Sequence, residues 1–159
     1  MAAPTATARG TPAGIQLCDG MFSVITFARK PTVSFWEKGV TPPGLEGGDA
    51  IDATSHHNVR YRTKCPRSLI DLTDVTTKVF YDPNVYNQII TNLINVRDTV
   101  TVEFHDGSTL AFFGYLKSFI PDEMTEGTKP EATITIVCTN FDHANDVEAG
   151  PVLTSVAGT

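Results

Sequence analysis

The chain has 159 residues, of which 41% are hydrophobic and 19% are charged, and its formal net charge is −6 at pH 7. This length suits one domain with a sizeable core, and the composition is ordinary for a globular protein. The acidic balance argues against a protein built to grip nucleic-acid phosphates, which normally carries a basic patch. No stretch approaches the ~20 apolar residues that cross a bilayer, and the N-terminus lacks the apolar segment of a signal peptide.

The first part of the chain, residues 1–20, is rich in Ala, Thr, Gly and Pro and shows no periodicity. We predict that it forms a flexible N-terminal arm, followed by a β domain over residues 21–141. That domain begins with two predicted strands, residues 22–27 and 32–37, separated by a turn that contains Lys-Pro. The only tryptophan, Trp36, belongs to the second of these strands, and its apolar neighbours predict a core position.

The three cysteines, Cys18, Cys65 and Cys138, are odd in number and far apart in the chain. No Cys-x-x-Cys pair occurs, so the usual zinc and redox motifs are missing. Cys138 lies in an apolar run, where a small buried hydrophobic residue is expected. The simplest inference is synthesis in a reducing compartment.

The most informative segment is residues 38–57, a long, acidic loop that is rich in Gly and Pro. A compact domain seldom carries ~20 residues of connection without secondary structure unless the loop has a function. The loop contains no nucleophile with a base, no phosphate-binding pattern and no metal-ligand spacing. We therefore predict that it contacts another protein molecule. The residues expected at this contact are Pro42, Pro43, Gly47, Gly48, Asp49, Asp52 and Thr54.

A basic segment follows, in which residues 58–64 alternate with period two and predict a strand. Its period would place Arg60, Arg62 and Lys64 on one face, and Arg67 comes shortly after them. These residues form either a solvated strand face or a contact with acidic groups. The acidic stretch 46–52 of a neighbouring subunit is the partner that we predict for that contact, because the charges are opposite.

The remaining elements are one helix and several strands. Residues 75–81 predict a strand, and Asp82 and Pro83 then predict the start of a helix over about 83–96, with apolar residues at spacings of three and four. The dipeptide Asp106-Gly107 between two alternating runs predicts a hairpin with a type I′ turn.

The second arm of that hairpin, residues 108–120, contains Gly114, which suggests a bulge or a close backbone approach. A strand over 131–140 and a polar C-terminal tail over 142–159 complete the chain. The sum is a mainly β fold, a sandwich or barrel of about seven strands with one flanking helix.

No group of residues predicts catalysis or metal binding. His56 and His57 are adjacent, so in an extended segment they point in opposite directions and do not share a metal. The pairs Asp49 with Asp52 and Glu123 with Glu126 lie in Gly/Pro-rich loops, where carboxylates commonly serve turns and solubility. We expect no enzyme activity, no catalytic or metal-binding residues and no cofactor.

Several short motifs, taken in order, resemble those of the tail tube proteins of long, flexible-tailed bacteriophages. They are Gly48–Thr54 after a Pro/Gly loop, the basic strand ending at Arg67, residues 80–83 that open a helix, and residues 104–107 followed by 112–115. The resemblance covers about residues 20–141. It implies a structural virion protein without enzyme activity, located in the phage tail and assembled in the cytoplasm of a bacterial host.

The resemblance also implies an assembly. Such subunits form homohexameric rings that stack helically into a hollow tube, and strands of six subunits close an inner barrel through which genome DNA is ejected. The implied partners are further copies of the chain and the tail terminator, tail tip and tape measure proteins, with no specific DNA binding and no membrane. Carboxylates lining the lumen would repel DNA phosphates. The candidates for that lining are Asp71, Asp74, Glu103 and Glu131.

Two alternatives stay open. One is a tube-forming subunit of a contractile injection or secretion apparatus. The other is a carbohydrate-binding β-sandwich module, which would need exposed aromatic side chains, whereas the sequence predicts that Trp36 is in the core. Some tail tube proteins carry an additional immunoglobulin-like domain, and the 18 residues after Phe141 are too few for one of ~100 residues.

Overall fold

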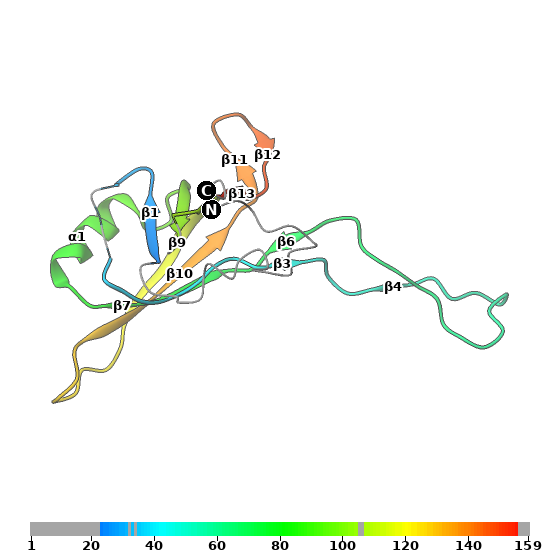
Figure 1. The fold of residues 1–159 in the computed structure, drawn as a ribbon, viewed down its shortest axis with the longest axis horizontal. Helices are drawn as coiled ribbons and strands as arrows, with labels where there is room; N and C mark the ends of the chain where they lie inside the picture. Colours follow the sequence, from blue (N-terminus) through cyan, green and yellow to red (C-terminus); the bar gives the residue numbers. More distant parts are fainter. Residues whose placement is uncertain (1–22, 32, 34, 105–106, 156–159) are drawn as a thin grey trace, which may run out of the picture.

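A seven-stranded antiparallel sheet and one helix make up the body of the protein, in a computed structural model that describes residues 23–31, 33, 35–104 and 107–155 (Figure 1). The predicted N-terminal arm, residues 1–20, lies outside the described residues. The sheet has the order β1-β8-β9-β10-β7-β2, with β13 paired to β9, and it curls into an open half-barrel. Its strands are β1 (Val24–Phe27), β2 (Glu37–Thr41), β7 (Val75–Phe80), β8 (Asp98–Glu103), β9 (Thr109–Pro121), β10 (Glu131–Cys138) and β13 (Val152–Thr154). The prediction of a mainly β fold with one flanking helix is confirmed.

The core lies against one face of this sheet, as the alternation of the strands predicts. In β10, Ala132, Ile134 and Ile136 are fully buried, while the threonines between them face the other side. The helix closes the core with Ile89 and Leu93, and all five residues belong to one cluster. The opposite face, which we call the polar face, carries mainly threonines and charged residues, with Phe113, Tyr115 and Val137 among them, and these three side chains are half-buried.

A bulge in β9 changes which side chains face the core. The pairing of β9 with β10 shifts by one residue at Lys117, so that Ser118 pairs with Thr135 and Leu116 with Ile136. Phe119 therefore turns inward and stacks with Tyr81, with ring centroids 5.9 Å apart.

Gly114, also in β9, allows a close approach of two backbones, because a Cβ at this position would lie 2.4 Å from the carbonyl oxygen of Val137. The predicted close backbone approach is confirmed.

The single helix, α1 (Pro83–Asn92), begins as the sequence predicts. Asp82 caps it by accepting a hydrogen bond from the backbone N–H of Asn84 at 2.9 Å. The helix ends four residues earlier than residue 96, the predicted end. Asn95 adopts a φ of +54°, and Ile94 pairs with β9 instead of continuing the helix.

The turn between β8 and β9 also differs in detail from the prediction. The backbone N–H of Phe104 donates to the carbonyl of Ser108, and the N–H of Gly107 donates to the carbonyl of Phe104. Gly107 has a φ of +86°. This pattern belongs to a three-residue loop closed by a glycine, not to the predicted two-residue type I′ turn, although Asp106 itself lies outside the described residues.

The strand predicted over 32–37 is wrong for the residues of this range that the structure describes, because β2 begins only at Glu37; residues 32 and 34 lie outside the described residues. The side chain of Trp36 is 66% exposed instead of buried, and the core positions here are taken by Val33 and Phe35. The Lys129 ammonium lies 5.7 Å from the Trp36 ring centroid and 4.4 Å from that of Phe80.

The largest departure from the sequence-based expectation lies between β2 and β7. Residues 42–74 form a long two-legged arm that leaves the sheet and extends far beyond it (Figure 1). Its legs are joined by two short antiparallel ladders, β3 (Leu45–Glu46) with β6 (Asp71–Leu72), and β4 (Ile51–Asp52) with β5 (Lys64–Cys65). The predicted loop therefore supplies the outgoing leg, and the segment predicted as a basic strand supplies most of the turn at the far end and the start of the returning leg.

The C-terminal part is paired to the body, although its sequence shows no periodicity. A small hairpin, β11 (Phe141–Asp142) with β12 (Val147–Glu148), follows β10. The strand β13 then pairs with Thr109–Ala111 of β9, beside the stretch that β10 does not reach. The last described residue is Ser155.

Candidate assembly surface

The arm has almost no core of its own. Every residue from Gly44 to Asp71 is exposed except Asn58, which is partly buried. Exposed positions include large apolar side chains, among them Val59 at 99% and Tyr61 at 77%. An isolated chain normally covers such side chains, so their exposure on a projecting element indicates a surface made for a partner.

The tip of the arm, which we define as residues 53–63, is nevertheless ordered. Its organiser is Asn58, whose side-chain amide donates to the carbonyl of Tyr61 at 2.8 Å and to the hydroxyl of Thr63 at 2.7 Å. The amide oxygen of Asn58 accepts from the backbone N–H of Ser55 at 2.8 Å. Thr54 accepts from the N–H of Thr63 at 3.1 Å and so closes the loop. The tip therefore presents its apolar side chains on a preformed scaffold.

The acidic and basic segments lie side by side within one chain. The Arg67 guanidinium donates through Nε to the carbonyl oxygen of Asp49 at 2.8 Å, and an Arg62 nitrogen lies 3.8 Å from an Asp52 carboxylate oxygen. The side chain of Arg67 also passes beneath Gly48, where a Cβ would lie 2.9 Å from the Arg67 Cδ. Part of the charge complementarity that the sequence assigns to two subunits is thus used inside the arm.

The predicted basic strand over residues 58–64 is wrong. Only Lys64 in this range is paired in a ladder, with Asp52, and the rest form the tip. Arg60, Arg62 and Lys64 therefore do not share one strand face. Arg60 instead leans toward the ring of the adjacent Tyr61, with its guanidinium carbon 6.0 Å from the ring centroid. Pro42 and Pro43 lie at the start of the arm, between β2 and β3.

Two separate hollows lie at the base of the arm, on opposite faces of the ladder of β3 with β6, and Leu69 and Ile70 contribute to both. The hollow that we call the base groove has a volume of about 500 Å³ and is lined by Glu46, Gly47, Gly48, Arg67, Leu69, Ile70 and Asp71. The other has a volume of about 280 Å³ and is lined by Leu45, Ser68, Leu69, Ile70, Leu72, Asn140, Glu148, Ala149, Gly150 and Pro151. Leu45, Leu69 and Ile70 are 70%, 78% and 66% exposed.

The four carboxylates predicted for a lumen do not form one group. Glu103 and Glu131 lie on the polar face of the sheet, and Glu131 is bound to Lys38. Asp71 lies in the base groove and accepts a hydrogen bond from the side chain of Asn140 at 3.0 Å. Asp74 lies between β6 and β7 at the same end of the molecule. The lumen role of these residues stays a prediction.

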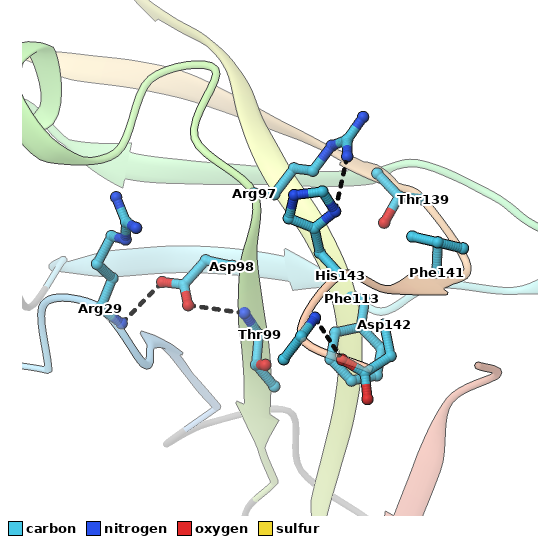
Figure 2. Close-up of a pocket in the computed structure, with 10 residues that line it drawn as sticks. Arg29, Arg97, Asp98, Thr99, Phe113, Thr139, Phe141, Asp142 and His143 are labelled. Carbon is cyan, nitrogen blue, oxygen red and sulfur yellow. Dashed lines mark hydrogen bonds between the residues drawn. The ribbon is translucent and has the colours of Figure 1, made fainter. Parts of the chain in front are cut away.

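A shallow pocket of about 210 Å³ lies where β1, β8 and β11 meet (Figure 2). Asp98 accepts hydrogen bonds from the backbone N–H groups of Arg29 and Thr99, at 2.8 and 2.7 Å. Arg97 donates to Nδ1 of His143 at 3.0 Å, so this histidine faces a cation instead of a carboxylate. The groups of this pocket hold loop ends in place, and none is arranged as a nucleophile with its base.

The described cysteines are inert or exposed. Burial, with a smaller contribution from the nearby carboxylates of Asp74 and Asp71, raises the pKa of the Cys138 thiol to about 11. It therefore stays a neutral packing group, as predicted. Cys65 is a free, exposed cysteine on the arm.

The described residues hold neither a cluster of metal-binding side chains nor a helix that could span a membrane. Across residues 23–155, apart from the four that are not described, no three His, Cys, Asp or Glu side chains are grouped to hold a metal ion. No helix in that part of the chain is long and apolar enough to span a membrane.

The apolar residues at the base of the arm could not be recognised from their sequence context. Leu45 stands alone in polar surroundings, and Leu69 and Ile70 form only a short apolar pair, which is found in many loops without a function. Asn58 could have been suspected, because Asn commonly bonds to the backbone of a turn. The pairing of two legs about 20 residues apart in the chain carried no local signal.

Comparison with known proteins bears on the fold. No protein-family model and no curated protein matches the chain. Among solved structures, one chain of the tail of an empty GTA particle, refined with C6 helical symmetry, superposes with a TM-score of 0.59 at 8% identity, covering 86% of this chain and 98% of that one. A chain of the sixfold-symmetrised baseplate of the anti-feeding prophage superposes with a TM-score of 0.50 at 8% identity, covering 83% and 90%. The chain therefore has the fold of proteins found in phage-type tails.

Proposed function

We propose that this protein is a structural subunit of a phage-type tail, in which its copies form rings that stack into a tail tube. In this proposal the protein is not an enzyme, and the tube is a passive conduit for genome DNA. The observation that carries the proposal is the arm, which projects from a closed core and exposes apolar side chains along its whole length. Such an element has no evident use in an isolated chain.

The sheet supports ring formation through its edges. β1 and β2 stand at the two ends of the strand order, and each has one side without a strand partner among the described residues, although on β1 the backbone N–H of Ile25 donates to the side chain of Glu37 at 3.1 Å, a bond that pairing with another copy would have to replace. Free edges invite pairing with another chain unless they are blocked. Pairing β1 of one copy with β2 of the next would extend the curled sheet around a ring, which removes both edges.

Six copies per ring and a flexible phage tail belong to the proposal. The C6 symmetry of the GTA tail, one chain of which has a similar fold, supports the first. Glu103 and Glu131 would then line the lumen if the polar face of the sheet points inward, where carboxylates repel DNA phosphates. The proposed partners beyond further copies are the tail terminator, tail tip and tape measure proteins, and assembly would occur in the bacterial cytoplasm.

A second candidate function is a ring subunit of a contractile injection apparatus. The similarity to a chain of the anti-feeding prophage baseplate favours it. This candidate shares the ring and the non-enzymatic role, and it differs in the cargo and in the sheath around the tube. The exposure of Trp36 would suit a carbohydrate-binding module, which stacks sugars on exposed aromatic rings. The Lys129 ammonium, however, already lies 5.7 Å from the Trp36 ring centroid.

Electron microscopy of the purified protein tests the proposal, together with light scattering across a concentration series. Rings with sixfold symmetry, or tubes built from them, are the expected result. A protein that stays monomeric at every concentration and binds a glycan array instead would overturn it. Tubes that bind a contractile sheath protein would favour the second candidate over the first.

A further inference from the structure

The two edge strands of the sheet lie against each other within one chain. β1 and β2 contact each other across a gap that we call the seam, although no ladder of hydrogen bonds joins them among the described residues. On the core side of the seam, the rings of Phe27 and Phe35 meet edge to face, with centroids 6.1 Å apart. The curled sheet is therefore almost closed on itself, and the seam is where its backbone pairing is interrupted.

β1 directs part of its backbone into the seam. The N–H of Ala28 donates to the carbonyl of Thr99, so every second residue of β1 bonds to β8 in the antiparallel register. Ile25 and Phe27 lie between those residues, and their backbone N–H and carbonyl groups point away from β8, toward the seam. Such outward groups of an edge strand are the ones with which a strand of another chain pairs.

The side chain of Glu37 occupies the centre of that edge. Glu37 begins β2 and pairs with Val79, whose side chain is buried, so both side chains lie on the core face of the sheet. From there the Glu37 carboxylate accepts a hydrogen bond from the Ile25 N–H at 3.1 Å. The carboxylate thus takes the place of the carbonyl oxygen that a neighbouring strand would supply.

This carboxylate is an expensive way to cover an edge. Glu37 is half-buried, and none of the ion pairs formed by the described residues includes it. Burial has the largest effect on its carboxyl group and raises the pKa above the ordinary value, because the charged form is poorly solvated. Natural sheets use charged side chains that point inward at an edge to prevent unwanted strand pairing. Glu37 has the position and the charge for that role.

We propose that Glu37 is a latch on the edge that forms the ring: it covers the backbone of β1 in the free chain, and a strand of a second copy displaces it on assembly. This inference rests on the proposed function, because it states how an edge used in the ring is kept from pairing beforehand. The displacing strand is β2 of the next copy, which is the other open edge of the same curled sheet. The exchange is balanced, since the Ile25 N–H gains a backbone carbonyl and the Glu37 carboxylate regains water.

Two substitutions of Glu37 separate the latch from a general effect of charge. Glu37→Ala removes the acceptor and uncovers the edge, whereas Glu37→Gln keeps a side-chain oxygen that accepts from the Ile25 N–H. The matched control is Glu123→Ala, because Glu123 is exposed in the loop between β9 and β10 and its loss changes the net charge by the same amount. Circular dichroism would verify that every variant is folded.

Hydrogen exchange of the Ile25 amide, followed by NMR at a concentration where the chains are monomeric, tests the contact itself. This amide should exchange at least about tenfold faster in Glu37→Ala than in the wild-type chain, and it should stay protected in Glu37→Gln and Glu123→Ala. Equal exchange in Glu37→Ala and the wild-type chain would overturn the latch. In assembled Glu37→Ala the amide should be protected again, and an amide that still exchanges fast there would show that β1 is not the joint.

Light scattering over a concentration series tests the effect on assembly. Glu37→Ala should assemble at a concentration about tenfold lower than the wild-type chain, because the bond to a charged acceptor no longer has to be broken. Glu123→Ala should keep the wild-type threshold, and Glu37→Gln should keep or raise it. If the wild-type chain assembles and Glu37→Ala assembles no more readily than Glu123→Ala, the latch is overturned and the proposed function stands. If no chain assembles at any concentration, the proposed function fails, and the latch fails with it.

Discussion

Replacing the arm with a tight turn should separate the stability of the body from its assembly. In the ladder of β3 with β6, Glu46 pairs with Asp71 and Leu45 with Leu72. A two-residue Asn-Gly turn in place of residues 47–70 would therefore close a hairpin at the pair Glu46 and Asp71 without disturbing the sheet. We expect a folded body that no longer assembles.

The magnitude follows from the exposure of the removed segment. Shortening the connection from about 24 residues to two lowers the closure entropy by (3/2)RT ln 12, or about 2 kcal/mol in favour of the folded state. Few favourable terms are lost in return. The exposed Arg62–Asp52 pair contributes ~0–1 kcal/mol, and the ladder of β4 with β5 has only two residue pairs. The buried side chain of Leu72 is retained. The free energy of unfolding should thus stay equal or rise by about 1–2 kcal/mol.

Urea unfolding followed by circular dichroism would measure this change at a protein concentration where both chains are monomeric, because assembly itself raises the apparent stability. Sedimentation and electron microscopy would measure assembly. A loss of more than about 2 kcal/mol would refute the reasoning that the arm is energetically separate from the body. Tubes of normal length from the shortened chain would refute its role in joining copies.

Three further outcomes are expected. Gly114→Ala should lower the free energy of unfolding by about 2–3 kcal/mol, because the new Cβ would lie 2.4 Å from the Val137 carbonyl oxygen. Gly39→Ala is the control and should change the free energy little, because no atom lies within 4 Å of its Cβ position. Equal effects of the two variants in urea unfolding would contradict this. Asp82→Ala should cost about 1 kcal/mol and Asp82→Asn much less, and a loss of the same size in both would show that the helix cap is not the cause. Burial raises the pKa of the Glu37 carboxyl above 4.5, so the folded chain binds its proton more tightly than the unfolded chain does. The free energy of unfolding should therefore fall as the pH rises from the unfolded pKa of Glu37 through its folded pKa. Glu37→Gln should remove that slope and stabilise the chain at pH 7, and an unchanged pH profile of unfolding would refute this reasoning.

The body of this protein could be predicted because its signals are local. Alternation in residues 131–138 places apolar and polar side chains on opposite faces, and the structure shows that arrangement. Asp82 and Pro83 mark the start of the helix, since capping depends on neighbouring residues alone. The end of the helix was mispredicted, because Ile94 is drawn into pairing with a strand that is distant in the chain. Tertiary contacts override local propensity there.

The arm was inaccessible to such reasoning. The alternation of residues 58–64 is typical of a half-buried strand, yet this segment has no sheet to lie on and forms a turn held by Asn58. The C-terminal residues 152–154 show the converse case, because they pair with β9 although their sequence lacks a strand pattern and all three are exposed. Trp36 is exposed because Val33 and Phe35 take the core positions, so the residue between Phe35 and Glu37 points to the opposite side; its carbonyl still accepts from the backbone N–H of Phe80 at 3.0 Å.

The two short ladders of the arm also have a mechanical consequence. Between them lie Gly47 and Gly48, and Gly48 has a φ of +77°, so the outgoing leg is interrupted at a point where backbone rotation is least restricted. Arg67 crosses between the legs at this joint and donates to the Asp49 carbonyl at 2.8 Å. If the arm bends, this hydrogen bond is the one that has to yield, while each ladder keeps its own pairing. The direction of the arm relative to the sheet would then be set by one arginine, which could be tested by replacing Arg67.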